Sequence, residues 1–416
     1  MAEYVSATAD SAKEFAKTRR SSIIAAIFLM ATSAIGPGFI TQTATFTVQL
    51  GAAFAFGILA SILIDFVVQL NVWRMVALSR MNASALANQA LPGSGYLLAI
   101  LVMFGGLVFN VGNIAGSGLG LNAMLDLDPK IGGAISAAIA LVIFSSKRAG
   151  AAVDRMIIWL GIVMIVLTAY VAVVSGPPLA EALRQSVFPD TINFAAITTI
   201  VGGTVGGYIT YAGAHRLLDK GTVGIENIDA VNQGALSGIA VTGVMRFVLF
   251  LAVLGVVSSG MVIDLTNKNA NPAAQAFQAA AGNFGLRAFG VVLWAAAITS
   301  VIGAAYTSMS FLQAFKPGIS ERSRNRATVV FILISLLVYL ALGTAPAALL
   351  VFAGGFNGLI LPLGLTIFMV IGWTRQDLLG GVPYPKWLLV LGSLVCVLTW
   401  YMAVVSVKPI FAFLGL

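Results

Sequence analysis

Two oppositely charged side chains lie in the middle of long apolar stretches of this sequence. Asp65 is embedded in ASILIDFVVQL, and Arg246 is embedded in TGVMRFVLFLAV. A charge in such surroundings is costly unless it is paired or faces water. We therefore weigh a structural role against a functional one. In the structural role, the two residues form an ion pair and nothing more. In the functional role, Arg246 helps receive an anion or Asp65 binds a coupling ion, while the other residue balances the charge.

Glycine-rich segments interrupt two other apolar stretches. The first reads Gly36-Pro37-Gly38-Phe39, and a Thr-rich run follows it. The second contains Gly202-Gly203 and Gly206-Gly207, with Tyr208 directly after. Proline removes a backbone hydrogen bond and glycine adds conformational freedom, so a helix should unwind at both points. A single glycine pair would be ambiguous, because small residues also allow close helix packing.

The composition sets the kind of protein in which these residues act. The chain has 416 residues, of which 59% are hydrophobic and 9% are charged, whereas about 25% of an ordinary soluble domain is charged. Its mean hydropathy is +0.98. We predict an all-α integral membrane protein with the lipid bilayer as its surroundings. This composition excludes a soluble enzyme and a nucleic-acid partner. The net charge of +8 is then explained by an excess of Lys and Arg in the cytoplasmic loops.

Apolar stretches of suitable length predict eleven transmembrane helices in one domain over residues 22–416. Most basic residues then fall in loops on one side, which places residues 1–21 in the cytoplasm as a short polar lead. The expected spans are 22–46, 51–77, 95–124, 131–146, 152–175, 193–218, 233–260, 286–314, 326–344, 346–373 and 386–415.

The two glycine-rich breaks fall in the first and sixth spans, five spans apart. An odd offset gives the second group of five the opposite orientation, as in an inverted repeat with discontinuous helices. We place the first repeat at about 22–175, the second at about 193–373, and an extra span at about 386–415. Because the broken points of such folds form the midplane substrate site, this pattern favours a transporter over a channel or a structural bundle.

Several segments resemble a known family. They are GPGF with QLGAAFAFGIL after it, GSGLGLN at 116–122, and VGGTVGGYITY at 201–211. The chain is similar in these segments to the natural-resistance-associated macrophage protein (NRAMP) transporters. The resemblance implies the leucine-transporter fold of the APC superfamily and proton-coupled secondary transport. It also implies a multi-pass protein of the bacterial cytoplasmic (inner) membrane.

The residues that hold metal in that family do not match. Its first-span motif is Asp-Pro-Gly-Asn, where this chain has Gly36-Pro37-Gly38-Phe39, and its sixth-span Met-Pro-His aligns with Gly206-Gly207-Tyr208. A divalent cation needs oxygen, nitrogen or sulfur ligands and a compensating charge, so we predict no metal site. Asn110 and Asn113 stand where acidic residues of the family's proton route lie. The alternative is that they join helices by hydrogen bonds.

The same changes remove side-chain volume at the breaks, which should make room for a small organic molecule. The helix that resumes near Phe39 presents unpaired amides, and these suit a carboxylate. We expect Phe39 and Tyr208 to enclose a ring. We also expect Thr41, Gln42 and Thr43 to bind the substrate or to satisfy the unwound backbone, and Asn357 to line the cavity. The GPGF subgroup resembles bacterial proteins encoded beside 5-oxoprolinase and lactam-utilisation genes, which suggests 5-oxoproline.

No cofactor is expected, and the coupling ion is H⁺ or Na⁺. His215, the single histidine, either takes part in proton coupling or is an interfacial residue beside Arg216 and Asp219. A run in the eighth span resembles the hydroxyl-bearing helix that holds sodium in related folds; it contains Thr299, Ser300, Thr307 and Ser308. Such hydroxyls often bond back to their own helix instead.

Three functions remain open at this point. The first is a secondary transporter of a small organic carboxylate, functioning as a monomer or weak oligomer. The second is a divalent-metal (Mg²⁺ or Mn²⁺) transporter with a widened site. The third is a membrane sensor that does not transport.

Overall fold

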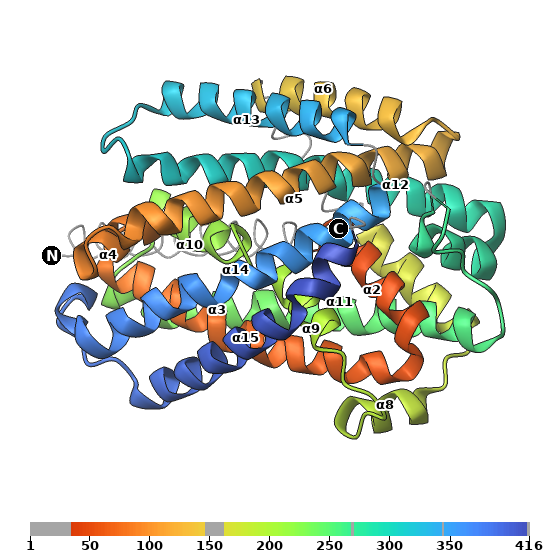
Figure 1. Ribbon diagram of the computed structural model, residues 1–416, viewed down its shortest axis with the longest axis horizontal. Helices are drawn as coiled ribbons and strands as arrows, with labels where there is room; N and C mark the ends of the chain where they lie inside the picture. Colours follow the sequence, from red (N-terminus) through yellow and green to blue (C-terminus); the bar gives the residue numbers. More distant parts are fainter. Residues whose placement is uncertain (1–34, 146–161, 268–269, 343–344, 414–416) are drawn as a thin grey trace, which may run out of the picture.

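The computed structural model describes residues 35–145, 162–267, 270–342 and 345–413. Every regular element in these ranges is helical, which confirms the predicted all-α class. The long helices run roughly along the longest axis of the molecule (Figure 1).

The helices follow the predicted spans closely. Short ones also occur that we did not predict, among them α4 and α8. In chain order they are α2 Pro37–Leu50, α3 Phe54–Ser79, α4 Ala83–Ala90, α5 Ser94–Leu125, α6 Pro129–Ser145, an unlabelled helix Ile162–Val174, α8 Leu179–Val187, α9 Phe194–Gly202, α10 Ile209–Asp219, α11 Ile228–Ser258, α12 Pro272–Ser310, α13 Glu321–Ala341, α14 Pro346–Thr374 and α15 Lys386–Ala412.

Seven stretches of the described chain are long and apolar enough to cross a membrane. An eighth is possible if the helix Ile162–Val174 and α8, bent by 107°, count as one span. The total of eleven stays a prediction, because α6, α9 and α10 are each shorter than a full crossing. The polar lead, the first half of span one and the start of span five lie outside the described residues.

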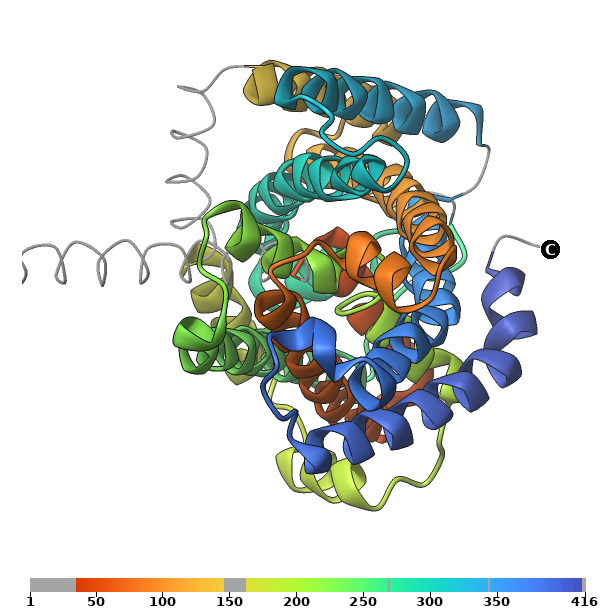
Figure 2. The ribbon, with the colours of Figure 1, turned by 90° about the vertical axis from the view of Figure 1, so that its left-hand side faces the viewer.

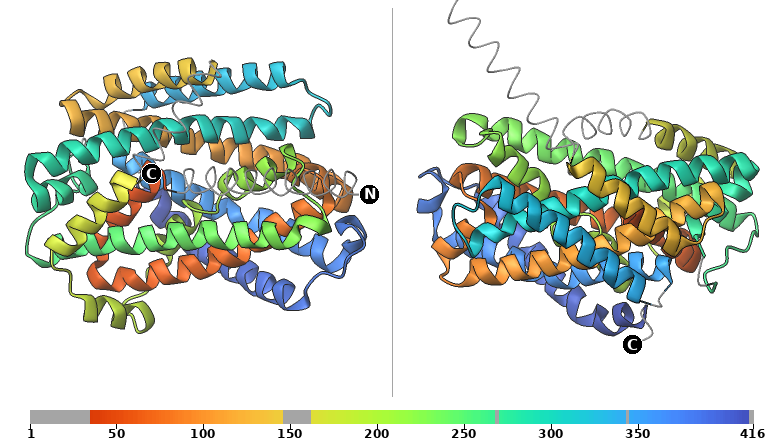
Figure 3. Two further views of the ribbon diagram at one scale, coloured as in Figure 1. Left: turned by 180° about the vertical axis from the view of Figure 1, so that it is seen from behind. Right: turned by 90° about the horizontal axis from the view of Figure 1, so that it is seen from above.

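Helices far apart in the sequence form two packed groups. In the first, α5 packs along α12, and α6 and α13 cover this pair as an outer layer (Figures 1 and 2). In the second, α3 lies beside α11 (Figure 3), α3 contacts the shorter helices α2, α9 and α10, and α11 contacts α2. α14 contacts both groups, and α15 packs against α14 and α9. The two predicted breaks are therefore enclosed by long helices.

The α5–α12 contact depends on glycine at two positions. A Cβ atom at Gly120 would lie 2.6 Å from the backbone nitrogen of Trp294, and one at Gly290 would lie 2.6 Å from that of Met124. Backbone atoms cannot move aside as a flexible side chain can, so only glycine permits this approach. This contact holds one side of the framework around the breaks.

We expect Gly120→Ala to destabilise the protein by about 1–3 kcal/mol, since the added methyl overpacks a backbone contact. The matched control on the same helix is Gly112→Ala, where the nearest atom would lie at an ordinary 3.4 Å. Alanine there gains up to about 1 kcal/mol of helix propensity. Thermal unfolding in detergent measures both. Equal melting temperatures for the two variants would contradict the packing argument.

Candidate functional site

The sixth span is broken where the two glycine pairs predicted it. α9 ends at Gly202 and α10 begins at Ile209. Between them the carbonyl oxygen of Val201 accepts hydrogen bonds from the amides of Thr204, Val205 and Gly206, at 3.2, 2.9 and 3.2 Å. Gly207 then takes a φ of +54°, which an L-residue with a side chain adopts only at a cost.

The glycines of this break do not widen a cavity as we expected. A Cβ at Gly206 would lie 2.6 Å from the Cα of Gly202, and one at Gly207 would lie 1.8 Å from Oδ1 of Asn357. A Cβ at Gly203 would lie 2.4 Å from Oε1 of Gln42. The volume lost from the side chains is filled by close backbone packing and by two buried amides, so this expectation was wrong.

The structure describes the first span from residue 35 onward, which includes the helix that follows the break. α2 begins at Pro37, and Gly36 precedes it with extended backbone and no side-chain cap. By helix geometry the amides of Gly38 and Phe39 point out of this end, and the first turn carries no acidic residue. Gln42 is fully buried and donates from Nε2 to the carbonyl oxygen of Leu350 at 2.9 Å. It thereby connects α2 to α14 beside the second break.

Phe39 and Tyr208 face different neighbours. The Tyr208 ring packs edge-on against Phe109 of α5, with centroids 5.7 Å apart, and Phe109 also lies 3.5 Å from where a Gly38 Cβ would sit. The Phe39 ring instead lies under the guanidinium of Arg246, 5.7 Å from its Cζ. The sequence did not single out Phe109, the residue that joins the two breaks.

Asp65 and Arg246 form an ion pair inside the protein. Arg246 Nη2 donates to Asp65 Oδ2 at 3.0 Å, and both side chains are fully buried. Thr204, in the second break, donates its hydroxyl to the same oxygen at 2.7 Å. Arg246 Nη1 donates to Ser61 Oγ. The cluster therefore joins α3, α11 and the broken segment, and Phe39 of α2 covers it.

Two atoms of this cluster have no hydrogen-bond partner among the described residues. They are Asp65 Oδ1 and Arg246 Nε, both buried. We had not selected Thr204 or Ser61. Ser61 precedes Asp65 by one helical turn and so shares its face, and Thr204 is the polar residue between the two glycine pairs. Both signals were present in the sequence.

The three predicted asparagines occupy different places. Asn357 donates from Nδ2 to the carbonyl oxygen of Gly105 at 3.0 Å, and its Oδ1 lies against Gly207, so it joins α5, α14 and the second break. Asn110 donates to Ser335 Oγ at 3.1 Å and so joins α5 to α13. This is the helix-joining alternative, and it directs the Asn110 amide away from the breaks. Asn113 is buried within α5.

His215 is buried and held as a neutral ring. The Ala83 amide donates to Nε2 at 3.2 Å, so Nδ1 carries the proton and lies 2.9 Å from Ser310 Oγ. The Ser310 hydroxyl in turn donates a hydrogen bond to the carbonyl oxygen of Thr307 at 2.6 Å. The ring therefore connects α10 to α4 and α12.

The predicted hydroxyl groups are buried near the breaks and along α12. Thr41 and Thr43 of α2 have Oγ1 atoms with no hydrogen-bond partner among the described residues. Ser300 and Thr307 are buried on α12. Thr299 bonds back to the carbonyl oxygens of its own helix, as the alternative to a sodium site had it.

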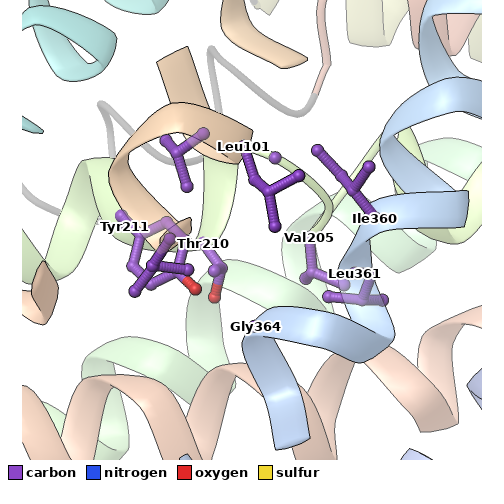
Figure 4. Close-up of a pocket in the computed structure, with 10 residues that line it drawn as sticks. Leu101, Val205, Thr210, Tyr211, Ile360, Leu361 and Gly364 are labelled. Atoms are coloured by element: carbon purple, nitrogen blue, oxygen red, sulfur yellow. The ribbon is translucent and has the colours of Figure 1, made fainter. Parts of the chain in front are cut away.

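A small cavity adjoins the second break (Figure 4). Its volume is about 20 Å³, which is room for about one water molecule. Its wall is mainly apolar, with the hydroxyl groups of Thr210 and Tyr211 on one side. The lining residues are Leu98, Leu101, Val102, Val205, Gly207, Thr210, Tyr211, Ile360, Leu361 and Gly364.

A sequence model of the natural resistance-associated macrophage protein-like family matches residues 27–408. The chain belongs to this family. It is 50% identical over 384 residues to the uncharacterized membrane protein YcsG of Bacillus subtilis (strain 168), covering 92% of this chain and 93% of YcsG. It is also 50% identical over 397 residues to a membrane protein of Haemophilus influenzae, covering 95% and 98%.

Solved structures confirm the leucine-transporter fold of this NRAMP-like protein. A manganese transporter of Eremococcus coleocola superposes with a TM-score of 0.74 at 16% identity, over 95% of this chain and 88% of that one. MhsT, solved with L-phenylalanine, gives 0.62 at 16% identity, over 94% and 98%. Mhp1, a nucleobase-cation-symport-1 transporter solved with bromovinylhydantoin, gives 0.56 at 15%, over 92% and 92%.

The contact between Gly207 and Asn357 predicts that a side chain at position 207 destabilises this NRAMP-like protein. Gly207→Ala should lose about 1–2 kcal/mol to the left-handed backbone, and about 1–3 kcal/mol more to the clash with Asn357. Gly221→Ala is the control, because Gly221 has a φ of +68° with nothing within 4 Å of its Cβ position. Thermal unfolding should show the larger loss for Gly207→Ala.

The double variant Gly207→Ala/Asn357→Ala removes the clashing amide. It should be less destabilised than the sum of the two single variants, since residues in contact are not additive. Strict additivity would show that Asn357 is not what restricts position 207.

Proposed function

We propose that this protein is a secondary active transporter of a small organic carboxylate, and that 5-oxoproline is the first substrate to test. The family and the fold are those of membrane transporters that work by alternating access. The finer proposal also places the protein in the bacterial cytoplasmic membrane, with its N-terminus in the cytoplasm and H⁺ or Na⁺ as coupling ion.

The observation that carries the proposal is the position of Arg246. Its guanidinium lies over the Phe39 ring at the start of α2, and its buried Nε has no partner among the described residues. The outward-pointing amides of the same helix end add the positive end of a helix dipole. These two features, from different helices, favour an anion at the first break.

The same cluster argues against a metal ion as the substrate. Asp65 is the one buried carboxylate among the described residues, and Arg246 and Thr204 already engage one of its oxygens. The family's ligand positions carry Gly36, Phe39 and Gly206, which offer no side-chain donor. A cation would have to bind beside a fixed guanidinium, which repels it.

Two structural neighbours support an organic substrate in this fold. MhsT was solved with an amino acid, L-phenylalanine, and Mhp1 with a hydantoin. The apolar cavity beside Gly207, with hydroxyl groups on one side, has the lining expected for a compact ring, but at about 20 Å³ it must open to admit one. The Eremococcus coleocola neighbour is a manganese transporter, so the metal alternative is tested in the same experiment.

The experiment is a thermal-shift screen of the purified protein, followed by uptake into proteoliposomes. We expect 5-oxoproline or a related small carboxylate to raise the melting temperature and to enter the vesicles, whereas Mn²⁺ and Mg²⁺ do neither. Stabilisation by micromolar metal, with none from any carboxylate, would overturn the proposal.

A charge at the start of α2 should compete with the substrate. Gly36→Asp adds a good helix cap but places a carboxylate at the same amides. We expect the apparent KM for 5-oxoproline to rise roughly tenfold, because such a charge is worth up to about 2 kcal/mol in partly buried settings. Gly36→Ser is the control, since it caps the helix without charge and should keep the KM near that of wild type. Equal kinetics in both variants would move the substrate carboxylate elsewhere.

A further inference from the structure

The Asp65–Arg246 cluster is electrically neutral and isolated. Among the described residues, no other Asp, Glu, Lys or Arg side chain is buried. The elements around it contribute Ser61 from α3, Thr204 from the broken segment and Phe39 from α2, none of them charged. Three other ionisable groups on α3 and its neighbours have partners of their own. His215 of α10 contacts Ala83 and Ser310, Arg74 of α3 lies over Tyr384, and Cys396 of α15 contacts Thr366.

An anion that reaches Arg246 would change this balance. The neutral pair would become a site with one net negative charge in a water-excluded interior, which is strongly unfavourable. One proton restores neutrality. The site then holds a protonated Asp65, the Arg246 guanidinium and the substrate carboxylate.

The geometry also provides a place for that proton. Asp65 Oδ2 already accepts hydrogen bonds from Arg246 and Thr204, whereas Asp65 Oδ1 is buried with no partner among the described residues. A proton can therefore bind Oδ1 without breaking the bond from Thr204. Arg246, no longer held by a full charge, becomes free to turn its Nε and Nη atoms to the substrate.

We propose that Asp65 is the proton-binding site of this transporter, and that Arg246 exchanges Asp65 for the substrate's carboxylate. This inference rests on the proposed function only in taking the substrate to be an anion. One proton enters with each carboxylate: the Asp65 carboxylate gains it as an O–H bond on the side where substrate binds, and that bond ionises on the side where substrate leaves. Thr204 links the event to the broken helix, because its hydroxyl bonds Asp65 while its backbone forms the turn.

The first test needs no transported substrate, only a small anion that can lie beside Arg246 once Asp65 is protonated. Infrared difference spectra of the protein in lipid, with chloride as that anion, are recorded between neutral and acidic pH. We expect wild type to gain the carbonyl stretch of a buried protonated carboxyl, and Asp65→Asn to lack it. Asp126→Asn is the control, because Asp126 also pairs with an arginine, Arg287, but is exposed; it should keep the band. A band that persists in Asp65→Asn overturns the inference, whatever the substrate.

The second test uses proteoliposomes and radiolabelled 5-oxoproline. Wild type should accumulate it about tenfold per unit of inward pH gradient, as expected for a one-to-one symport, and a membrane potential alone should drive none. Asp65→Asn should still exchange internal for external 5-oxoproline but lose pH-driven accumulation. Undiminished accumulation in this variant, or accumulation driven by sodium, overturns the inference.

Two further results separate this inference from the proposed function. If wild type neither exchanges nor accumulates 5-oxoproline, the proposed substrate fails, and the infrared band alone decides the role of Asp65. If Asp65→Asn does not fold because Arg246 is left unpaired, Asp65→Asn/Arg246→Gln removes both charges and should restore expression. This double variant should show neither the band nor pH-driven accumulation, and either one in it overturns the inference.

Discussion

A single buried ion pair is the constraint around which this molecule is arranged. Asp65 and Arg246 have no access to water, so each charge requires the other, and α3 and α11 must lie side by side to bring them together. The hydroxyl of Thr204 also bonds Asp65 and thereby connects the unwound segment of the sixth span to the ion pair. In a membrane interior, removing either charge would leave the other stranded.

Close packing of backbone sets the rest of the site. The second break lies against α14, where a Cβ at Gly202 would stand 2.0 Å from the carbonyl oxygen of Gly354. Two buried amides, Gln42 and Asn357, fill the space that larger family side chains would take. The broken sixth span of this NRAMP-like protein is thus tightly packed at its centre.

The sequence predicted the class, most helix positions and the second break, because apolar length and glycine–proline content are local signals. It also offered an ion pair between Asp65 and Arg246 as one alternative, because a lone charge in an apolar span needs a partner or water, and the structure contains this pair. It did not predict which way side chains face. Phe39 turns to Arg246, Tyr208 turns to Phe109, and Asn110 turns to α13. Such choices depend on helix rotation and on neighbours distant in the chain, which no short motif encodes.

The Asn357 side chain lies between α5 and the second break, and this position constrains which substitutions the family can accept. Its Oδ1 lies 2.3 Å from a Cβ position at Gly105 and 1.8 Å from one at Gly207. A side chain added at either glycine requires the Asn357 amide to move, and shrinking Asn357 first leaves a void and removes its hydrogen bond to the carbonyl oxygen of Gly105. The three positions, on three separate segments, are therefore coupled, and among distant relatives they should covary as one unit.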